Sequence, residues 1–211
     1  MQSHPDLPDT AVTQAAIQLA HSTESPSVFN HSVRSYLFAE ALATHEGMRA
    51  DVEYTREALF LGCMLHDLGL GTAAPGKERF EVEGADLAVT LLTEHGCERA
   101  LVDAVWEAIA LHSSAGIAER RGALCYLVRG GVGVDFGRNA EFIDDQTAAA
   151  VHIQYPRLSM ASTLVDAIVA HGRRTPEAAP PYSLPGDVLR ERRADGVTLL
   201  ERAASQGRWG N

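Results

Sequence analysis

The sequence lacks the features that mark a secreted or membrane protein. It contains only three cysteines, none in a Cys-x-x-Cys pair and none beside a histidine in a catalytic context, so reduced and mostly buried thiols are expected. Its most apolar run, residues 58–65, is far shorter than the roughly 20 residues that a membrane-spanning helix needs. The polar, acidic start MQSHPDLPDT does not resemble a secretory signal. We therefore expect a soluble, cytoplasmic protein.

Basic residues are also scarce. Lysine and arginine number 18 against 28 aspartates and glutamates, which gives a formal net charge of −10. Binding to a nucleic-acid backbone or to anionic lipid requires a basic surface, so neither partner is predicted. A small molecule, including a small anion held by a few local cations, remains compatible with this charge. The sequence leaves the oligomeric state open.

Aromatic residues make up only 6% of the chain and alanine is plentiful, which favours helix over sheet. We expect one all-α domain of about seven to nine helices over residues 1–211, with its core at about 28–172. Residues 1–10 are expected to form a loose lead-in, and residues 176–185 a connection to a C-terminal helix. Helices are predicted at about residues 10–21, 28–45, 52–66, 83–95, 98–113, from 118 to the glycine-broken GGVGVDFG, 144–152, 160–171 and 187–205.

The pair His66-Asp67 is the strongest functional signal. It ends a predicted helix that is apolar nearly all round and should therefore be central and buried. Burying a neutral imidazole beside a carboxylate costs several kcal/mol unless both groups are satisfied. A metal ion would satisfy both. The alternative is that Asp67 caps the next turn and His66 only bonds to it.

Two further residues extend this pair to a set of four. His31 begins a helix with an apolar inner face, and Asp135 stands between two apolar residues after a predicted glycine-rich turn. Hydrolytic metal sites ordinarily combine histidines with carboxylates. Alone, Asp135 would more often be a capping residue. Together the four residues form the order His, His-Asp, Asp over three separate segments.

This ordered quartet, with the phrase LGCMLHDLGL, resembles the signature of the HD-domain superfamily of metal-dependent hydrolases. The resemblance implies an all-helical fold over about residues 28–172. It implies metal-ligand roles for His31, His66, Asp67 and Asp135. The cofactor implied is one divalent metal ion, with zinc first and iron, manganese or nickel as alternatives.

Within this superfamily, the chain is most similar to the cyanamide hydratase group. Nucleotidases and alarmone hydrolases commonly have a glutamate three residues after the His-Asp pair, and cyclic-dinucleotide phosphodiesterases a lysine, where this chain has Leu70. Di-iron oxygenases need two further histidines, and Phe80 or Glu81 occupies the place of the first. The stretches similar to cyanamide hydratases are HSVRSYLFA (31–39), the HDLG region, RFEVEGAD (79–86), AIALHSSAGIA (108–118) and YPRLS (155–159).

Three more residues are candidates for catalysis or substrate binding. His112 lies on the inward stripe of its helix and could shuttle a proton near neutral pH, with a core histidine bonded to backbone as the alternative. Arg34 lies one turn beyond His31, and Lys77 lies in the loop after the His-Asp pair. Either could orient a polar substrate or stabilise negative charge, with a solvated surface charge as the alternative.

The expected function is therefore a metal-dependent hydrolase or hydratase of a small molecule. Metal-bound hydroxide would attack an electrophilic carbon such as that of a nitrile, with Asp67 accepting a proton and His112 supplying one. The main alternative is an HD-type phosphohydrolase of a nucleotide or small phosphomonoester, held by Lys77 or Arg34. A non-catalytic ligand-binding HD protein and an iron-dependent oxygenase are further alternatives.

Overall fold

The computed structural model describes residues 7–211 and is entirely helical. This part of the chain contains ten α-helices, two short 3-10 helices and no β-strand, which confirms the predicted fold class. Of the predicted lead-in, residues 1–6 lie outside the described residues. Residues 7–10 run up to the first helix, which the Thr10 side chain caps by accepting the Thr13 N–H.

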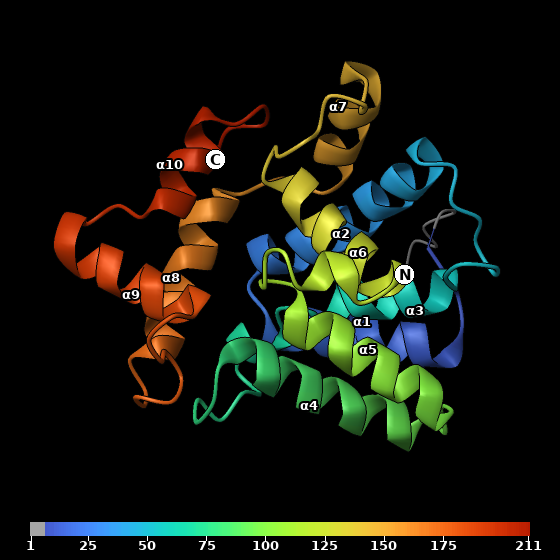
Figure 1. The fold of residues 1–211 in the computed structure, drawn as a ribbon, viewed down its shortest axis with the longest axis horizontal. Helices are drawn as coiled ribbons and strands as arrows, with labels where there is room; N and C mark the ends of the chain where they lie inside the picture. Colours follow the sequence, from blue (N-terminus) through green and yellow to red (C-terminus); the bar gives the residue numbers. More distant parts are fainter. Residues whose placement is uncertain (1–6) are drawn as a thin grey trace.

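Short connections join most of the helices, so neighbours in sequence are usually neighbours in space (Figure 1). The helices are α1 (Ala11–Thr23), α2 (Pro26–His45), α3 (Arg56–Leu65), α4 (Phe80–Glu94), α5 (Arg99–Leu111), α6 (Ala123–Asp135), α7 (Asp145–Gln154), α8 (Met160–Gly172), α9 (Leu184–Asp195) and α10 (Leu199–Gln206). The 3-10 helices are η1 (Leu68–Leu70) and η2 (Ala118–Arg120).

Helix α3 is the centre of the larger hydrophobic core. All of residues 58–65 are buried, and α1, α2, α5 and α6 pack around them. The helix begins at Arg56 rather than at the predicted Val52. The Thr55 side chain caps it by accepting the Ala58 N–H, and Asp51 has a positive φ of 62° that no helix can include.

Helices α8, α9 and α10 form a second layer at one end of the molecule (orange to red in Figure 1). Helix α8 packs against α2 and α4 of the first layer. Apolar residues of α8 meet Phe80 and Phe136, which belong to the first layer, in a second hydrophobic cluster. The single domain over residues 1–211 stays a prediction.

The glycine-rich segment before Asp135 does not form the predicted turn. Gly130, Gly131 and Gly133 continue α6 down to Asp135, its last residue. A Cβ atom at Gly131 would lie 2.1 Å from the carbonyl oxygen of Ser35 in α2, so only glycine allows the two helices to come this close. The local preference for a break is outweighed by close helix packing.

The predicted C-terminal helix is two helices, which raises the count above the expected seven to nine. Gly196, with a φ of +73°, ends α9, and Thr198 caps α10 with a capping box. Residues 173–183 connect α8 to α9. The predicted connection at 176–185 overlaps this stretch, but its last two residues already belong to α9, which Ser183 caps.

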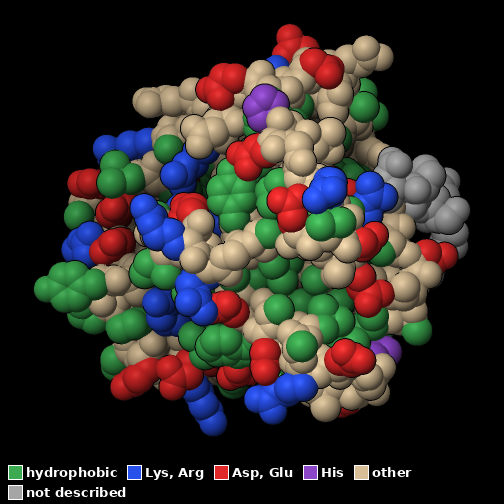
Figure 2. All heavy atoms as spheres, turned by 45° about the vertical axis from the view of Figure 1, so that its right-hand side comes forward, with side chains coloured by type: hydrophobic (Ala, Val, Ile, Leu, Met, Phe, Trp, Pro, Cys, Tyr) green, Lys and Arg blue, Asp and Glu red, His purple; other side chains and the backbone are tan. Residues whose placement is uncertain are grey.

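Two observations bear on the predicted absence of membrane and nucleic-acid partners. Among residues 7–211, no helix has both the length and the apolar character needed to cross a bilayer. On the face in Figure 2, acidic side chains lie between the basic ones, and no continuous basic surface forms there. The exclusion of these partners stays a prediction.

The packing of α6 on α2 can be tested with Gly131→Ala. The added methyl group would meet the Ser35 carbonyl oxygen, which belongs to backbone and cannot move aside. We expect the free energy of unfolding to fall by about 2–3 kcal/mol, measured by denaturant titration.

Gly133→Ala is the matched control in the same helix. Its Cβ would lie 4.0 Å from the nearest heavy atom outside the helix backbone, the Cβ of Arg138. Replacing this helical glycine with alanine should leave stability unchanged or raise it by up to about 1 kcal/mol. Equal effects of the two substitutions would contradict the proposed role of the close contact.

Candidate metal centre

His66 and Asp67 lie where α3 ends in the protein interior. The apolar residues of α3 bury that helix on every side, so the two residues that follow it are buried as well, with 0% and 2% of their surfaces exposed. His66 is the C-cap of α3, and Asp67 precedes η1. Both side chains therefore need partners inside the protein.

Helices α2 and α6 bring His31 and Asp135 together, although 104 positions separate them in the sequence. Both side chains are fully buried. His31 Nδ1 donates a hydrogen bond to Oδ2 of Asp135 at 2.6 Å. The close approach of the two helices at Gly131 makes this contact possible.

In the neutral rings of His31, His66 and His112, Nδ1 carries the proton. Nδ1 of His31 donates this proton to the Asp135 carboxylate. His66 Nδ1 donates to the Cys63 carbonyl oxygen at 2.7 Å, and His112 Nδ1 donates to the Ile109 carbonyl oxygen at 2.7 Å. A neutral ring with its proton on Nδ1 has a free lone pair on Nε2. Each of the three rings therefore presents Nε2 as a ligand or proton acceptor.

The Nε2 atoms of His31 and His66 and one oxygen of Asp67 converge. The two nitrogens are 3.3 Å apart, and Oδ2 of Asp67 lies 3.1 Å from His66 Nε2 and 3.7 Å from His31 Nε2. None of these atoms has a proton to donate when the rings are neutral, and Oδ2 has no hydrogen-bond partner among the described residues. Two imidazole nitrogens and an orphaned buried carboxylate oxygen fit a divalent metal ion.

The pKa values of the site reflect burial and mutual charge. Burial alone lowers the pKa of His66, but the negative charge of Asp67 outweighs it and raises that pKa. Burial alone raises the pKa of Asp67, but the neighbouring imidazoles hold it well below its usual range. Burial lowers the pKa of His31, although Asp135 opposes the shift. A proton and a metal ion therefore compete for Nε2 of His66.

His112 lies beside these ligand atoms, at the end of α5. Its Nε2 is 3.8 Å from Oδ1 of Asp67, the oxygen that does not face the other two histidines. Burial and, to a smaller extent, the nearby His66 lower the pKa of His112 to about 4. Near neutral pH the ring is therefore uncharged. His112 faces the protein interior, as its place on the inward stripe of the helix predicts, while its catalytic role stays a prediction.

Asp135 does not occupy the predicted position of a fourth metal ligand. Its Oδ1 accepts from Arg34 Nε at 2.7 Å, and its Oδ2 accepts from Arg34 Nη2 at 2.8 Å as well as from His31. Arg157 Nη1 adds a contact of 3.3 Å to Oδ1. The carboxylate thus lies behind His31, on the side of the ring opposite Nε2, where it orients the ring.

Arg34 is neither in the pocket nor at the surface, so both interpretations of this residue are wrong. Its side chain is fully buried, and the bidentate pair with Asp135 uses Nε and Nη2. Nη1 donates to the carbonyl oxygens of Tyr155 and Pro156, at 3.0 and 3.2 Å. Because the guanidinium is occupied inside the protein, Arg34 is not placed to hold a substrate.

Lys77 is also outside the pocket, which contradicts its predicted contact with substrate. Its side chain is exposed and does not line the cavity beside the metal centre. The loop is held by Glu83, whose carboxylate accepts the backbone N–H groups of Gly76, Lys77 and Glu78 at 2.8, 2.5 and 2.9 Å. This loop anchor directs the lysine side chain to solvent.

A cavity of about 260 Å³ opens beside the ligand atoms. His31, His66, Asp67 and His112 line its polar part. The remaining wall is mostly apolar, and the second layer of helices contributes four of its side chains. Its apolar residues are Phe80, Ala115, Val132, Phe136, Leu164, Ile168, Leu184 and Leu200.

Comparison with known proteins identifies this architecture. Residues 28–171 match the HD domain family, which is more than half of the chain. The chain belongs to the HD domain family. Similar proteins include cyanamide hydratase DDI2 and cyanamide hydratase DDI3 of Saccharomyces cerevisiae, each 25% identical over 173 residues, or 80% of this chain and 76% of the relative. The predicted resemblance is confirmed.

Two charged residues with buried polar atoms, Arg157 and Glu24, were not predicted in this HD protein. Arg157 donates to the Asp135 carbonyl oxygen at 2.9 Å and to the Gly210 carbonyl oxygen at 3.0 Å. Both carboxylate oxygens of Glu24 are buried without a hydrogen-bond partner among the described residues, and burial, with the charge of Asp67, raises the pKa of Glu24. Arg157 lies in the stretch YPRLS, which was noted only for its similarity to cyanamide hydratases, and Glu24 follows a helix end, where a charge is ordinarily solvated.

Asp135→Asn tests the buried ion pair between Asp135 and Arg34, which orients His31 in the HD site. Arg34 would remain buried with its charge no longer balanced, so the free energy of unfolding should fall by about 3–5 kcal/mol near pH 7. Burial alone would raise the pKa of Asp135, but Arg34 and His31 hold it well below its usual range. Its ionised form therefore stabilises the fold above pH ~4, and this contribution is lost as the pH falls further.

Denaturant titrations from pH 7 down to pH ~3 would measure the difference between the two proteins, which should shrink toward the acid end. Asp103→Asn is the control, because its pair with Arg99 is exposed and should contribute under about 1 kcal/mol. If Asp135→Asn proves as stable as the parent at pH 7, the buried ion pair does not have the role assigned to it.

Proposed function

We propose that this HD-domain protein is a metal-dependent hydratase that adds water across a carbon–nitrogen triple bond of a small molecule. The observation that carries this proposal is the convergence of unprotonated atoms of His31, His66 and Asp67 on one side of a largely apolar cavity. The similarity to two yeast cyanamide hydratases supports the choice of reaction. With cyanamide, the addition of one water molecule yields urea.

His31, His66 and Asp67 would hold one divalent ion, with zinc as the first candidate and iron, manganese and nickel as alternatives. When bound, such an ion acts as a Lewis acid and lowers the pKa of a water molecule to about 7. Asp135 lies on the side of the His31 ring opposite Nε2, and its hydrogen bond keeps the proton of His31 on Nδ1, so that Nε2 is free to bind the ion.

The two oxygens of Asp67 allow it two tasks. Oδ2 faces His31 and His66, whereas Oδ1 faces His112 Nε2 at 3.8 Å. In the proposed reaction, the water oxygen bonds to the nitrile carbon while Oδ1 accepts one of its protons. His112, uncharged with Nε2 free, takes this proton from Oδ1 on Nε2 and passes it to the nitrile nitrogen. The resulting imidic acid becomes the carboxamide when its remaining hydroxyl proton moves to nitrogen.

The cavity wall contributes by excluding bulk water. Phe80 and Phe136 flank the histidines, with ring centroids 5.7 Å from His112 and 5.5 Å from His31 respectively. An apolar surrounding strengthens the interactions between the charged groups of the site. The same wall favours an uncharged reacting group such as a nitrile.

Two alternative functions lose the residues that were expected to serve them. A phosphohydrolase was expected to hold phosphate with Lys77 or Arg34, and neither residue lines the cavity, where the cations are Arg129 and Arg138. The similarity to cyanamide hydratases and the mostly apolar wall favour the hydratase over this alternative. At the place of the first additional histidine of di-iron oxygenases, Phe80 forms part of the apolar wall and Glu81 bonds to Arg79 and Ser113. A non-catalytic protein would have no need to keep three ligand atoms converging in a buried cavity.

The hydratase proposal predicts that zinc-loaded protein converts cyanamide to urea and leaves nucleoside monophosphates intact. His66→Ala should lose both bound zinc and turnover, because one of two imidazole ligands is removed. Elemental analysis and urea determination measure the two effects. His95→Ala is the control, since that histidine is exposed and only bonds to the Leu91 carbonyl oxygen. Full metal content in His66→Ala would refute the ligand assignment, and phosphate release would favour the phosphohydrolase.

The proposed relay predicts a different effect for His112→Gln. Loss of a general acid–base group should lower kcat by about 10²- to 10⁴-fold, whereas zinc content stays at the parent level because His112 is not one of the three ligands. Steady-state kinetics and elemental analysis check both parts. His95→Gln should change neither. Loss of zinc from His112→Gln would make His112 a ligand instead, and an unchanged kcat would remove it from the mechanism.

A further inference from the structure

The cavity beside the metal centre is larger than cyanamide requires. Its volume of about 260 Å³ equals roughly nine times the 30 Å³ that one water occupies in the liquid. Cyanamide has only three non-hydrogen atoms and would occupy a small part of that space. A substrate that fills the cavity therefore carries further atoms beyond the reacting group.

The chemistry of the wall indicates what those atoms are. Leu164 and Ile168 of α8, Leu184 of α9 and Leu200 of α10 all line the cavity together with the metal-site residues. Four aliphatic side chains from three different helices of the second layer form one continuous part of the lining. Such a wall binds an apolar body, because burying apolar surface is favourable by about 25 cal/mol per Å².

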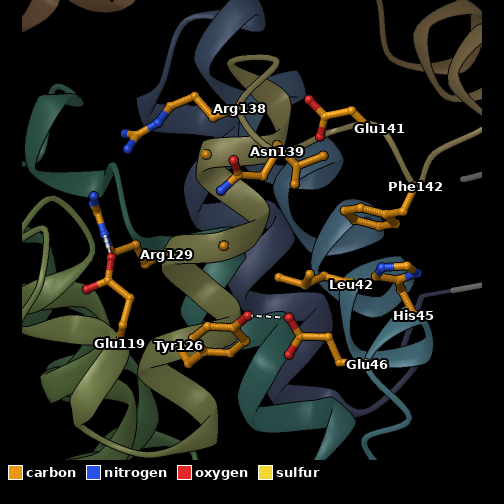
Figure 3. A pocket seen from close by; sticks show the side chains of 13 residues that line it. Leu42, His45, Glu46, Glu119, Tyr126, Arg129, Arg138, Asn139, Glu141 and Phe142 are labelled. Carbon is orange, nitrogen blue, oxygen red and sulfur yellow. Dashed lines mark hydrogen bonds and ion pairs between the residues drawn. The ribbon is translucent and has the colours of Figure 1, made fainter.

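Two arginines from α6 and the segment after it line the same cavity. Arg129 is already neutralised, since its Nε is 2.6 Å from a carboxylate oxygen of Glu119 and its Nη1 donates to the His112 carbonyl oxygen at 2.9 Å. Arg138 is exposed, and its guanidinium has no ion pair or hydrogen bond among the described residues. In Figure 3 both arginines extend to the same side of α6, away from His45 and Phe142. Arg138 is thus the cation that is free to bind a ligand.

A second cavity limits how far such a ligand extends. This outer cavity, of about 480 Å³, shares Arg129, Gly133 and Arg138 with the inner one, so the two adjoin at these residues (Figure 3). Three glutamates line the outer cavity, namely Glu46, Glu119 and Glu141. An anionic group is therefore attracted to Arg138 at the junction and repelled from the space beyond it.

We propose that the substrate is a nitrile or cyanamide with an apolar body that ends in an anionic group bound by Arg138. The carbon–nitrogen triple bond lies at the histidines, the body lies along the aliphatic wall, and the anion lies at the junction of the two cavities. This inference rests on the proposed hydratase function. The reaction is unchanged: R–C≡N and H₂O give R–C(=O)–NH₂, and the anionic group takes no part in it.

The test uses zinc-loaded full-length protein and probes that differ in one carboxylate. 4-Cyanobenzoate is compared with benzonitrile, and 3-(4-cyanophenyl)propanoate with 4-propylbenzonitrile, so that two lengths are covered. For at least one length, the dissociation constant from calorimetry and the KM for hydration should be about three- to tenfold lower for the carboxylate, as for a partly exposed ion pair. Arg138→Gln should abolish this preference.

Arg173→Gln is the matched control, because Arg173 is exposed, does not line the cavity and changes the net charge equally. It should keep the preference of the parent. Arg138→Glu provides a second variant and should reverse the preference, so that 4-(aminomethyl)benzonitrile binds more tightly than 4-cyanobenzoate. The reversal cannot come from a carboxylate that binds the metal directly.

The outcomes separate this inference from the hydratase proposal. Turnover of cyanamide with no preference for carboxylate at either length overturns the inference alone. A preference that survives Arg138→Gln also overturns it, since the carboxylate is then bound elsewhere. If zinc-loaded protein hydrates neither cyanamide nor any nitrile, the proposed function fails, while calorimetry still decides whether Arg138 binds the anionic group.

Discussion

The location of one proton on each of three imidazole rings is the constraint on which the site depends. His66 and His112 are the C-cap residues of α3 and α5, and each bonds through Nδ1 to the carbonyl oxygen three positions earlier. Helix ends leave such carbonyls without an intrahelical partner, so they are ready acceptors. The same contact therefore completes a helix and frees Nε2. For His31, which lies within a helix, Asp135 replaces the missing carbonyl.

The hydrogen bond from His31 to Asp135 gives a reason for the buried ion pair between Asp135 and Arg34. Taking Arg34 and Asp135 out of water is costly, and a buried pair adds to stability only when its remaining donors and acceptors are satisfied. Here Arg34 reaches two carbonyl oxygens, and Arg157 bonds to both Asp135 and the C-terminal Gly210. The network ties α2 and α6 to two later segments. Its benefit is the fixed orientation of His31.

The first layer of helices supplies the proposed metal site, and the second layer supplies the aliphatic wall proposed to contact the substrate. Helices α2, α3 and α5 and the segments that follow them supply every residue proposed to bind the ion or move a proton. Helices α8, α9 and α10 supply the aliphatic wall, through residues such as Leu164 and Leu200. The aliphatic side chains of the wall are not among the proposed ligands, so they can change without altering the proposed metal site. Under the proposed function, substrate choice depends on this wall and on Arg138.

The sequence by itself predicted the helical fold and singled out the pair His66-Asp67, because both predictions depend on local order: an apolar period of 3.6 residues, and a polar pair that follows a buried helix. The proposed ligand role of His31 came from the ordered quartet that resembles the HD signature. The roles of Arg34, Lys77 and Asp135 were decided only by tertiary structure. A side chain's partner depends on which helix packs against its own, and here those helices are about 100 residues apart. For the same reason glycines that predict a turn lie inside α6, where contact with α2 outweighs local preference.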